Sequence, residues 1–405
     1  MASSSLHAPE SQSVTFVELF FDLVFVFAVT QITVALAHDL TWSGAVRSLL
    51  LFWLIWWAWT QFTWTLNPAD TTHRAVRTIT LAATGTAFVM AASVPLAYDD
   101  DALWFAIPYV VVRSLGLYLQ ARVDSERGAD DAHLITRWAW GSTVGLVLVL
   151  AGALIEPPAR NWLWVLVIVA DLGAATLAGQ GKTWDLSPSH VAERHGLFVI
   201  IALGESLIVA GAAIAGDERT AELVTAALAS VVVVSLLWWT YFDWFKDSLE
   251  VGLEAAPPIN LGRLTRDAYS LSHLPLVCGI IGVAVAVEEI MVHPEEAAPQ
   301  QVLVALATGV ALFLGSTVLA HWRLHGDVLG TRVAITVMTA VAVLVSPEWL
   351  PFWPLVAVAV GLVVLIVLER HRTVDGSSEP REGGGAANGT TSAGQPGPGL
   401  AAPHP

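Results

Sequence analysis

The sequence predicts an all-α fold, a polytopic transmembrane helical bundle of about twelve helices, and three observations lead to it. Hydrophobic residues make up 55% of the chain and charged residues only 13%, with a mean hydropathy of +0.64, which is too apolar for a soluble domain. Apolar runs of about 20 residues, the length that crosses a bilayer as a helix, recur throughout. Positive charge gathers in alternate loops between these runs.

The apolar runs form a series from residue 16 to residue 369. Hydropathy identifies membrane helices because lipid does not tolerate unsatisfied backbone polar groups. The expected spans are at about residues 16–37, 45–66, 76–98, 102–120, 134–154, 161–180, 193–215, 222–245, 270–291, 301–320, 329–346 and 350–369. The last four runs are the least clearly separated, so eleven or thirteen helices are the alternatives to twelve.

Loop charge predicts the orientation of the chain. Twelve Lys or Arg residues lie in or beside the loops after even-numbered helices, and three lie in those after odd-numbered helices. By the positive-inside rule both termini are cytoplasmic. Residues 1–15 are then a cytoplasmic N-terminal segment, without the features of a signal peptide. Residues 371–405, rich in Gly, Ser, Pro and Ala, are expected to be a disordered cytoplasmic tail.

A short internal similarity predicts two six-helix halves, residues 16–182 and 183–370. LIWWAWTQF (residues 54–62) aligns with LLWWTYFDW (residues 236–244), six helices further on, and the first helix can likewise be laid on the seventh. Because six is even, the halves share one orientation and form a parallel 6+6 repeat. Chance similarity of two Trp-rich helix faces is the alternative.

Acidic side chains lie within the predicted spans. Glu18 and Asp22 are four residues apart and share one face of the first helix, while Glu205 is near the centre of the seventh. A carboxylate at that depth is costly unless it is protonated, paired or in a wet cavity, so it indicates a functional site by default. The alternative is that Glu18 lies at the interface and Asp22 makes a structural bond to another helix.

Arg113 lies midway along the fourth helix and is always ionised, so it needs a carboxylate or water as a partner. Asp22 and Glu205 are the best candidates, and Asp171 in the sixth helix is another. A structural ion pair that fixes helix register is the alternative to a transport site. The candidate residues for binding a substrate or ion are Glu18, Asp22, Gln31, Arg113, Asp171, Glu205 and Ser206.

Four further residues lie at predicted cytoplasmic helix ends, where gating contacts are expected: Gln61, Arg194, His195 and Asp243. Arg194 and His195 are most simply topology signals, although His195 titrates near neutral pH if it lines a cavity. The tryptophans of residues 53–64 are too deep to form only an interfacial belt. They are expected to pack, with indole N–H groups bonded to neighbouring helices; a cation–π site is the alternative.

Several classes of function receive no support. A net charge of −16 argues against nucleic acid as a partner, because binding phosphates takes basic patches. Cys278 is the only cysteine, so neither an intrachain disulfide nor a multi-cysteine metal site can form. The sequence contains no G-x-S-x-G, H-E-x-x-H or phosphate-binding glycine motif, and we expect no catalytic residues, metal or cofactor. The expected partners are the lipid bilayer and a proton or cation; oligomerisation stays open.

Four segments carry a family resemblance: VELFFDLVFVFAVTQ (residues 17–31), WWAWTQFTWTLNPAD (residues 56–70), ERHGLFVIIALGESLI (residues 193–208) and WWTYFDWF (residues 238–245). Together they resemble the bacterial low temperature requirement protein A family. The resemblance implies a multi-pass protein of the bacterial inner membrane; the family name reflects growth in the cold and does not identify a reaction. A second, shorter resemblance is to the Phe-Ser-Asp signature of a potassium-channel family, in which Phe20 and Asp22 match and Phe21 departs.

Two classes of function follow from these residues. The first is a transporter or channel for a proton, cation or small solute, in which intramembrane carboxylates bind the cargo between two halves. The second is a membrane-embedded enzyme or sensor that acts on lipid or on a partner protein in cold adaptation. We rank it lower because no catalytic motif supports it.

Overall fold

The chain folds as an all-helical bundle, which confirms the predicted fold class. A computed structural model describes residues 6–8, 12–126, 129–178, 184–216, 219–348 and 351–376, with side chains described except in 129–140 and 371–376. Within these ranges, twelve helices have 15 residues or more. Eight of the helical segments are long and apolar enough to cross a membrane, as expected of a multi-pass membrane protein.

The first six long helices match the first six predicted spans. They are α1 (Phe16–His38), α2 (Trp42–Leu66), α3 (Arg74–Ala92), α4 (Leu103–Ser125), α5 (Ala129–Ala153) and α6 (Ala159–Ala178). A short 3-10 helix, η1 (Val94–Leu96), precedes α4. Helix α1 begins at a capping box, in which Thr15 and Glu18 bond to each other's side chain and backbone.

The remaining long helices match the last six predicted spans. They are α7 (Pro188–Gly216), α8 (Ala221–Phe242), α11 (His273–Val292), α12 (Gln300–His325), α13 (Gly330–Leu344) and α14 (Trp353–Gly376). Helix α14 continues past residue 370, and the rest of the predicted disordered tail, residues 377–405, lies outside the described residues.

The connection between α8 and α11 contains structure that hydropathy did not predict. It folds into α9 (Phe245–Glu254), α10 (Pro258–Thr265) and a π-helical turn, η2 (Arg266–Leu271). In α9 the buried residues are Phe245, Leu249 and Leu253, spaced at four residues. This stripe holds the helix against the bundle, and at 10 residues α9 is too short to cross the bilayer by itself.

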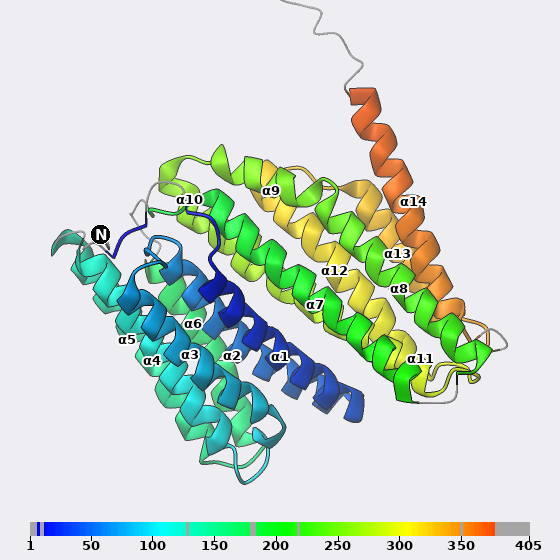
Figure 1. Ribbon diagram of the computed structural model, residues 1–405, viewed down its shortest axis with the longest axis horizontal. Coiled ribbons are helices and arrows are strands. Elements are labelled where there is room, and N and C mark those ends of the chain that lie inside the picture. The colour runs from blue at the N-terminus through cyan, green and yellow to red at the C-terminus, as the bar shows by residue number, and fades with distance from the viewer. Residues whose placement is uncertain are drawn as a thin grey trace, which may run out of the picture.

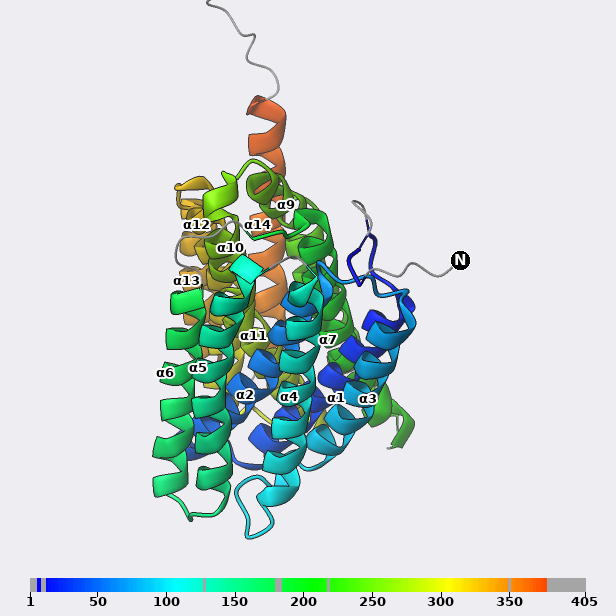
Figure 2. The ribbon, with the colours of Figure 1, turned by 90° about the vertical axis from the view of Figure 1, so that its left-hand side faces the viewer.

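The helices form two groups that lie side by side (Figure 1). One group contains α1 to α6 and the other α7 to α14, and α1 and α2 contact α7 and α11 where the groups meet. The beginning of α1 and the end of α14 lie at the same face of the bundle, which we call the terminal face; the opposite face is the far face (Figures 1 and 2). This agrees with an even number of spans, while the 6+6 repeat itself stays a prediction.

The N-terminal segment packs onto the connection between α2 and α3. Leu6 is buried, and its carbonyl accepts a hydrogen bond from the Asp70 amide at 2.7 Å. The Ala8 amide donates to the Pro68 carbonyl at 3.0 Å. Residues 6–8 are therefore held against the terminal face by the connection between α2 and α3.

Glycines allow α11 and α12 to approach closely. A Cβ atom on Gly309 of α12 would lie 2.8 Å from the Val283 amide nitrogen and 2.9 Å from the Gly279 carbonyl oxygen. A Cβ atom on Gly279 would in turn lie 2.6 Å from the Gly309 carbonyl oxygen. Backbone atoms cannot rotate away as a flexible side chain can, so these positions require glycine, as small residues do at membrane helix interfaces.

We expect Gly309→Ala to lower the free energy of unfolding by about 1–3 kcal/mol, the usual cost of overpacking a filled interior. Thermal unfolding in detergent measures the loss. Gly315→Ala on the same helix is the matched control, because a Cβ atom there would meet nothing within 4 Å. Equal stability of the two variants would contradict the close approach of α11 and α12.

Candidate functional site

A buried ion pair joins the two groups of helices. Asp22 of α1 pairs with the guanidinium of Arg194 of α7, and both side chains are fully buried. Arg194 Nε also lies 3.4 Å from Asp22 Oδ2, and the indole N–H of Trp59 donates to Asp22 Oδ1 at 2.7 Å. The Trp59 ring lies against the guanidinium, 5.8 Å from ring centroid to Cζ. Asp22 is therefore held by one cation and one neutral donor.

Glu18 shares the same guanidinium at a greater distance. Its Oε1 atom lies 3.6 Å from Arg194 Nη1 and 3.1 Å from Nε2 of His190, a residue one turn before Arg194 on α7. Its Oε2 atom accepts from the backbone amide and the hydroxyl of Thr15, both at 2.9 Å. Glu18 is as buried as Asp22, but its carboxylate is farther from the Arg194 guanidinium and interacts with it more weakly.

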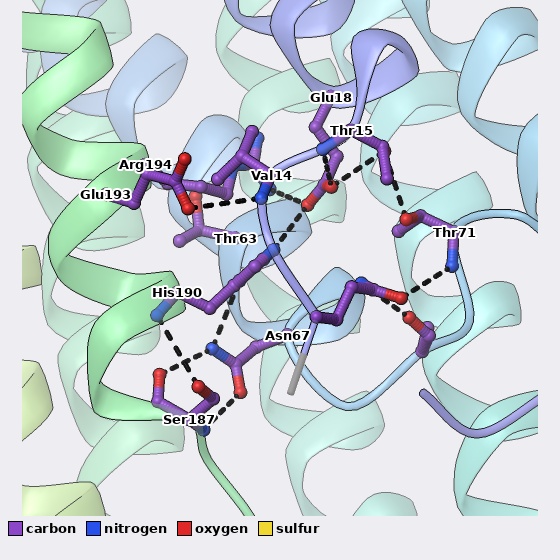
Figure 3. A network of polar contacts seen from close by, with 12 residues as sticks. Val14, Thr15, Glu18, Thr63, Asn67, Thr71, Ser187, His190, Glu193 and Arg194 are labelled. Atoms are coloured by element: carbon purple, nitrogen blue, oxygen red, sulfur yellow. Dashed lines mark hydrogen bonds and ion pairs between the residues drawn. The ribbon is translucent and has the colours of Figure 1, made fainter. Parts of the chain in front are cut away.

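The hydrogen bonds around His190 indicate its protonation state (Figure 3). The Asn67 amide is oriented by Ser187, whose N–H donates to Asn67 Oδ1 at 2.8 Å and whose carbonyl accepts from Nδ2 at 3.1 Å. Asn67 therefore presents its NH₂ group to His190 Nδ1, 3.3 Å away. In the tautomer in which Nδ1 accepts this bond, the ring proton is on Nε2, facing Glu18, and the ring carries no charge.

The charges of this site do not balance. Glu18 and Asp22 are two carboxylates, Arg194 is one cation, and His190 is neutral in this arrangement. A buried group of this kind carries one uncompensated negative charge, which is costly in a low-dielectric interior. One added proton or other small cation removes that cost.

The site is covered on the terminal face by the start of the chain (Figure 3). The Thr15 hydroxyl lies 3.0 Å from the hydroxyl of Thr71, and the Val14 amide donates to Glu193 Oε2 at 3.1 Å. Gln12 bonds to the backbone at Ala69. The N-terminal segment thus links α7 to the connection between α2 and α3, directly over Glu18.

Arg113 has a different partner from the two that we ranked first. It pairs with Asp171 at 3.4 Å and donates to the Tyr109 hydroxyl at 2.8 Å. Glu205 is on α7, in the other group of helices, and Asp22 is already paired with Arg194, whereas Asp171 is on α6 in the same group as α4. Gln61, predicted to make gating contacts at a helix end, is buried and donates to the Arg113 carbonyl at 3.1 Å.

His195 lies within an aromatic cluster and is buried, whereas the sequence placed it at a cytoplasmic helix end. Its ring centroid is 4.9 Å from that of Trp59, 5.1 Å from Tyr269 and 5.0 Å from His273. Its Nδ1 atom bonds to the Val191 carbonyl at 2.9 Å. His195 is therefore packed among aromatic rings, and a gating role for it stays a prediction.

The tryptophans of α2 bond to neighbouring helices, as the packing interpretation predicted. Trp53 reaches Asp171 Oδ2 at 3.4 Å, and Trp56 reaches the Ser270 carbonyl at 2.7 Å. Trp64 bonds to the hydroxyl of Ser270 at 2.9 Å. Ser270 lies in the π-helical turn η2, so these two indoles tie α2 to the segment that precedes α11.

The other candidate residues stay apart from this site. Gln31 and Glu205 are half-buried, Asp243 is exposed, and Ser206 is buried. Within the described part of the chain, none of the four makes a side-chain hydrogen bond or ion pair. No group of three or more His, Cys, Asp or Glu side chains is placed to hold a metal ion among the residues that the structure describes.

Sequence reasoning did not assign Asn67 or His190 to the site, and it expected the indole N–H of Trp59 to bond to a neighbouring helix without placing it beside Asp22. His190 had a usable signal, because it is four residues before Arg194 and so shares its helix face. Asn67 had no such signal, and neither had the particular bond of Trp59 to Asp22, because both depend on which helices become neighbours.

Comparison with known protein families shows to which family this chain belongs. The profile of the bacterial low temperature requirement A protein (LtrA) matches residues 13–367. The chain belongs to this family. A protein of Rhizobium meliloti (strain 1021), itself described as uncharacterized, is 31% identical over 315 residues, which cover 75% of this chain and 76% of the relative. No solved structure matches the chain.

In this LtrA chain, the segments that carry the family resemblance also carry the site. Residues 17–31 contain Glu18 and Asp22, residues 56–70 contain Trp59, and residues 193–208 contain Arg194. The folded chain brings these three segments together around one buried guanidinium.

We expect Arg194→Gln to lower the free energy of unfolding by about 3–5 kcal/mol, because it leaves two buried carboxylates without their cation. Adding Asp22→Asn should recover part of the loss, since one of those charges is then removed. Thermal unfolding of both variants in detergent measures this. Lys246→Gln is the control; it breaks the partly exposed pair with Glu250, worth about 0–1 kcal/mol. Additive losses in the double variant would contradict the coupling.

Proposed function

We propose that this LtrA-family protein is a membrane transporter or channel whose buried carboxylates bind a proton, and that Glu18 is the group that exchanges it. One observation carries the proposal. Two buried carboxylates share a single arginine beside a neutral histidine, so the site has one negative charge more than it can compensate. Intramembrane carboxylates in such a position are typical of proton and ion pathways.

The two carboxylates differ in how firmly they are held. Asp22 has the close ion pair with Arg194 and the indole N–H of Trp59, two contacts that favour its ionised form and fix the guanidinium. Glu18 is 3.6 Å from Arg194, and its other contacts are neutral donors. The excess charge is therefore relieved at Glu18. Protonation of His190 instead would point a new N–H at the NH₂ group of Asn67.

A hydroxyl pair is available to pass the proton. The Thr15 hydroxyl has one hydrogen and two acceptors in reach, Glu18 Oε2 at 2.9 Å and Thr71 Oγ1 at 3.0 Å. When Glu18 is protonated, its O–H donates to Thr15 Oγ1, and the Thr15 hydrogen turns to Thr71. This path leads from the buried site toward the terminal face, under the N-terminal segment.

The site also couples protonation to helix movement. Arg194 belongs to α7 and both carboxylates belong to α1, one from each group of helices. Neutralising Glu18 weakens its attraction for α7, while Asp22 keeps the two helices joined. A change in the spacing of α1 and α7 is the movement that a transporter built from two helix groups requires.

We expect the protein in proteoliposomes to carry protons when a membrane potential is imposed, measured with a pH-sensitive dye inside the vesicles. Glu18→Gln should abolish the flux, because an amide accepts the Thr15 hydrogen bonds but cannot be protonated. Thr15→Val should slow it. Glu193→Gln is the matched control, since its amide oxygen still accepts from Val14.

The flux assay can reject the proposal in two ways. Wild-type protein that carries no protons above empty vesicles would contradict proton transport. Undiminished flux through folded Glu18→Gln protein, with unchanged gel filtration and thermal unfolding, would show that the proton does not use this carboxylate. Glu205→Gln tests the second intramembrane carboxylate in the same assay.

We further propose that the terminal face is cytoplasmic, in the inner membrane, as the loop charges predict. A Cys278→Ala background allows single cysteines to be labelled in intact cells. Glu296→Cys, in the far-face connection between α11 and α12, should react with an impermeant maleimide. Glu254→Cys, at the end of α9, should react only after the cells are permeabilised. The reverse pattern would invert the orientation.

A further inference from the structure

A cavity of about 730 Å³ lies where the two groups of helices meet, away from the charged site. Its walls come from the second half of α1, the first half of α2, the middle of α11 and the first half of α12. Ile32, Phe52, Ile281 and Leu312 are among its lining side chains. It therefore occupies the part of the bundle nearer the far face, whereas Glu18 and Arg194 are near the terminal face.

The lining chemistry changes along the cavity. No Asp, Glu, Lys, Arg or His side chain lines it, so it offers no counter-charge to an ion. At one end it is lined by Thr41 just before α2, Trp42 at the start of α2, and Gln300 and Gln301 at the start of α12, while the hydroxyls of Ser48 and Thr308 lie further along the walls. Helix starts at the far face lie at bilayer interface depth, where Trp is favoured. The deeper end is apolar.

We propose that this cavity binds one acyl chain of a membrane phospholipid, with the headgroup at the end formed by Thr41, Trp42 and Gln300. An uncharged, apolar cavity is dry and takes apolar guests rather than water or ions. Its volume is within the range of small-molecule sites. Thr308 of its walls is exposed on α12, which is long and apolar enough to cross the bilayer, and Leu49 is exposed on α2, so we expect hydrocarbon to surround the opening.

A lipid chain in this cavity would lie between the two groups of helices and contact both. Helices α1 and α2 belong to one group and α11 and α12 to the other, so a bound chain lies between the groups. It supports their separation at the far face while the Asp22–Arg194 pair joins them near the terminal face. Lipid binding and proton binding thus act on the same pair of helix groups from opposite ends.

Photochemical labelling tests the proposal on the full-length protein in proteoliposomes. The probe is phosphatidylethanolamine with a diazirine near the end of one acyl chain, and mass spectrometry maps the adducts. We expect adducts to concentrate on lining residues such as Ile281, Leu312 and Cys278. Ala45→Phe and Thr308→Trp fill the cavity from opposite walls and should remove these adducts. Val337→Trp, on the exposed face of α13, is the control and should leave them unchanged.

Three results would overturn the assignment. Adducts spread evenly over all lipid-facing helices would mean that the lipid only surrounds the protein. Cavity adducts that persist in folded Ala45→Phe and Thr308→Trp protein would place the lipid elsewhere; gel filtration and thermal unfolding establish the fold. Labelling by a diazirine fatty acid, without labelling by the phospholipid, would make the ligand a free acid. Because the readout is labelling, it is independent of proton flux.

Discussion

The buried pair between Asp22 and Arg194 is the interaction on which the arrangement of this protein depends. It is an ion pair between the two groups of helices, and both of its side chains are fully buried. The attraction between two buried opposite charges offsets the cost of removing them from water only if their geometry is good and further hydrogen bonds are made. Trp59 supplies such a bond, and with it the second helix joins α1 and α7. The register of three helices is thereby fixed around one guanidinium.

The same solution recurs within each group of helices. Arg113 is paired with Asp171 inside the first group, and Arg332 with Glu369 inside the second, at 3.4 and 2.6 Å. Each of these arginines has one carboxylate, so their charges balance. The site at Arg194 is different because Glu18 adds a second carboxylate. That imbalance is the physical reason for assigning proton binding to this site and a structural role to the other two.

The two ends of the contact between the groups differ in chemistry. Near the terminal face it is charged and closed over by the N-terminal segment, which bonds to α7 and to the connection after α2. Toward the far face it opens into an uncharged apolar cavity. A protein that changes the spacing of two helix groups needs a firm contact at one place and a deformable one at another. A bound hydrocarbon chain can supply the second, because it has no fixed geometry.

The sequence by itself determined the helical membrane fold, the number and approximate positions of the long helices, and the polar residues within them. These depend on local hydropathy and on the cost of a charge in lipid, both of which can be read along the chain. The sequence did not determine which polar side chains pair with one another. Arg113 pairs with Asp171, and Glu18 meets His190 and Arg194, because of which helices become neighbours. The short helices α9 and α10 were missed for a related reason, since amphipathic segments of eight to ten residues acquire stability only from the bundle they pack against.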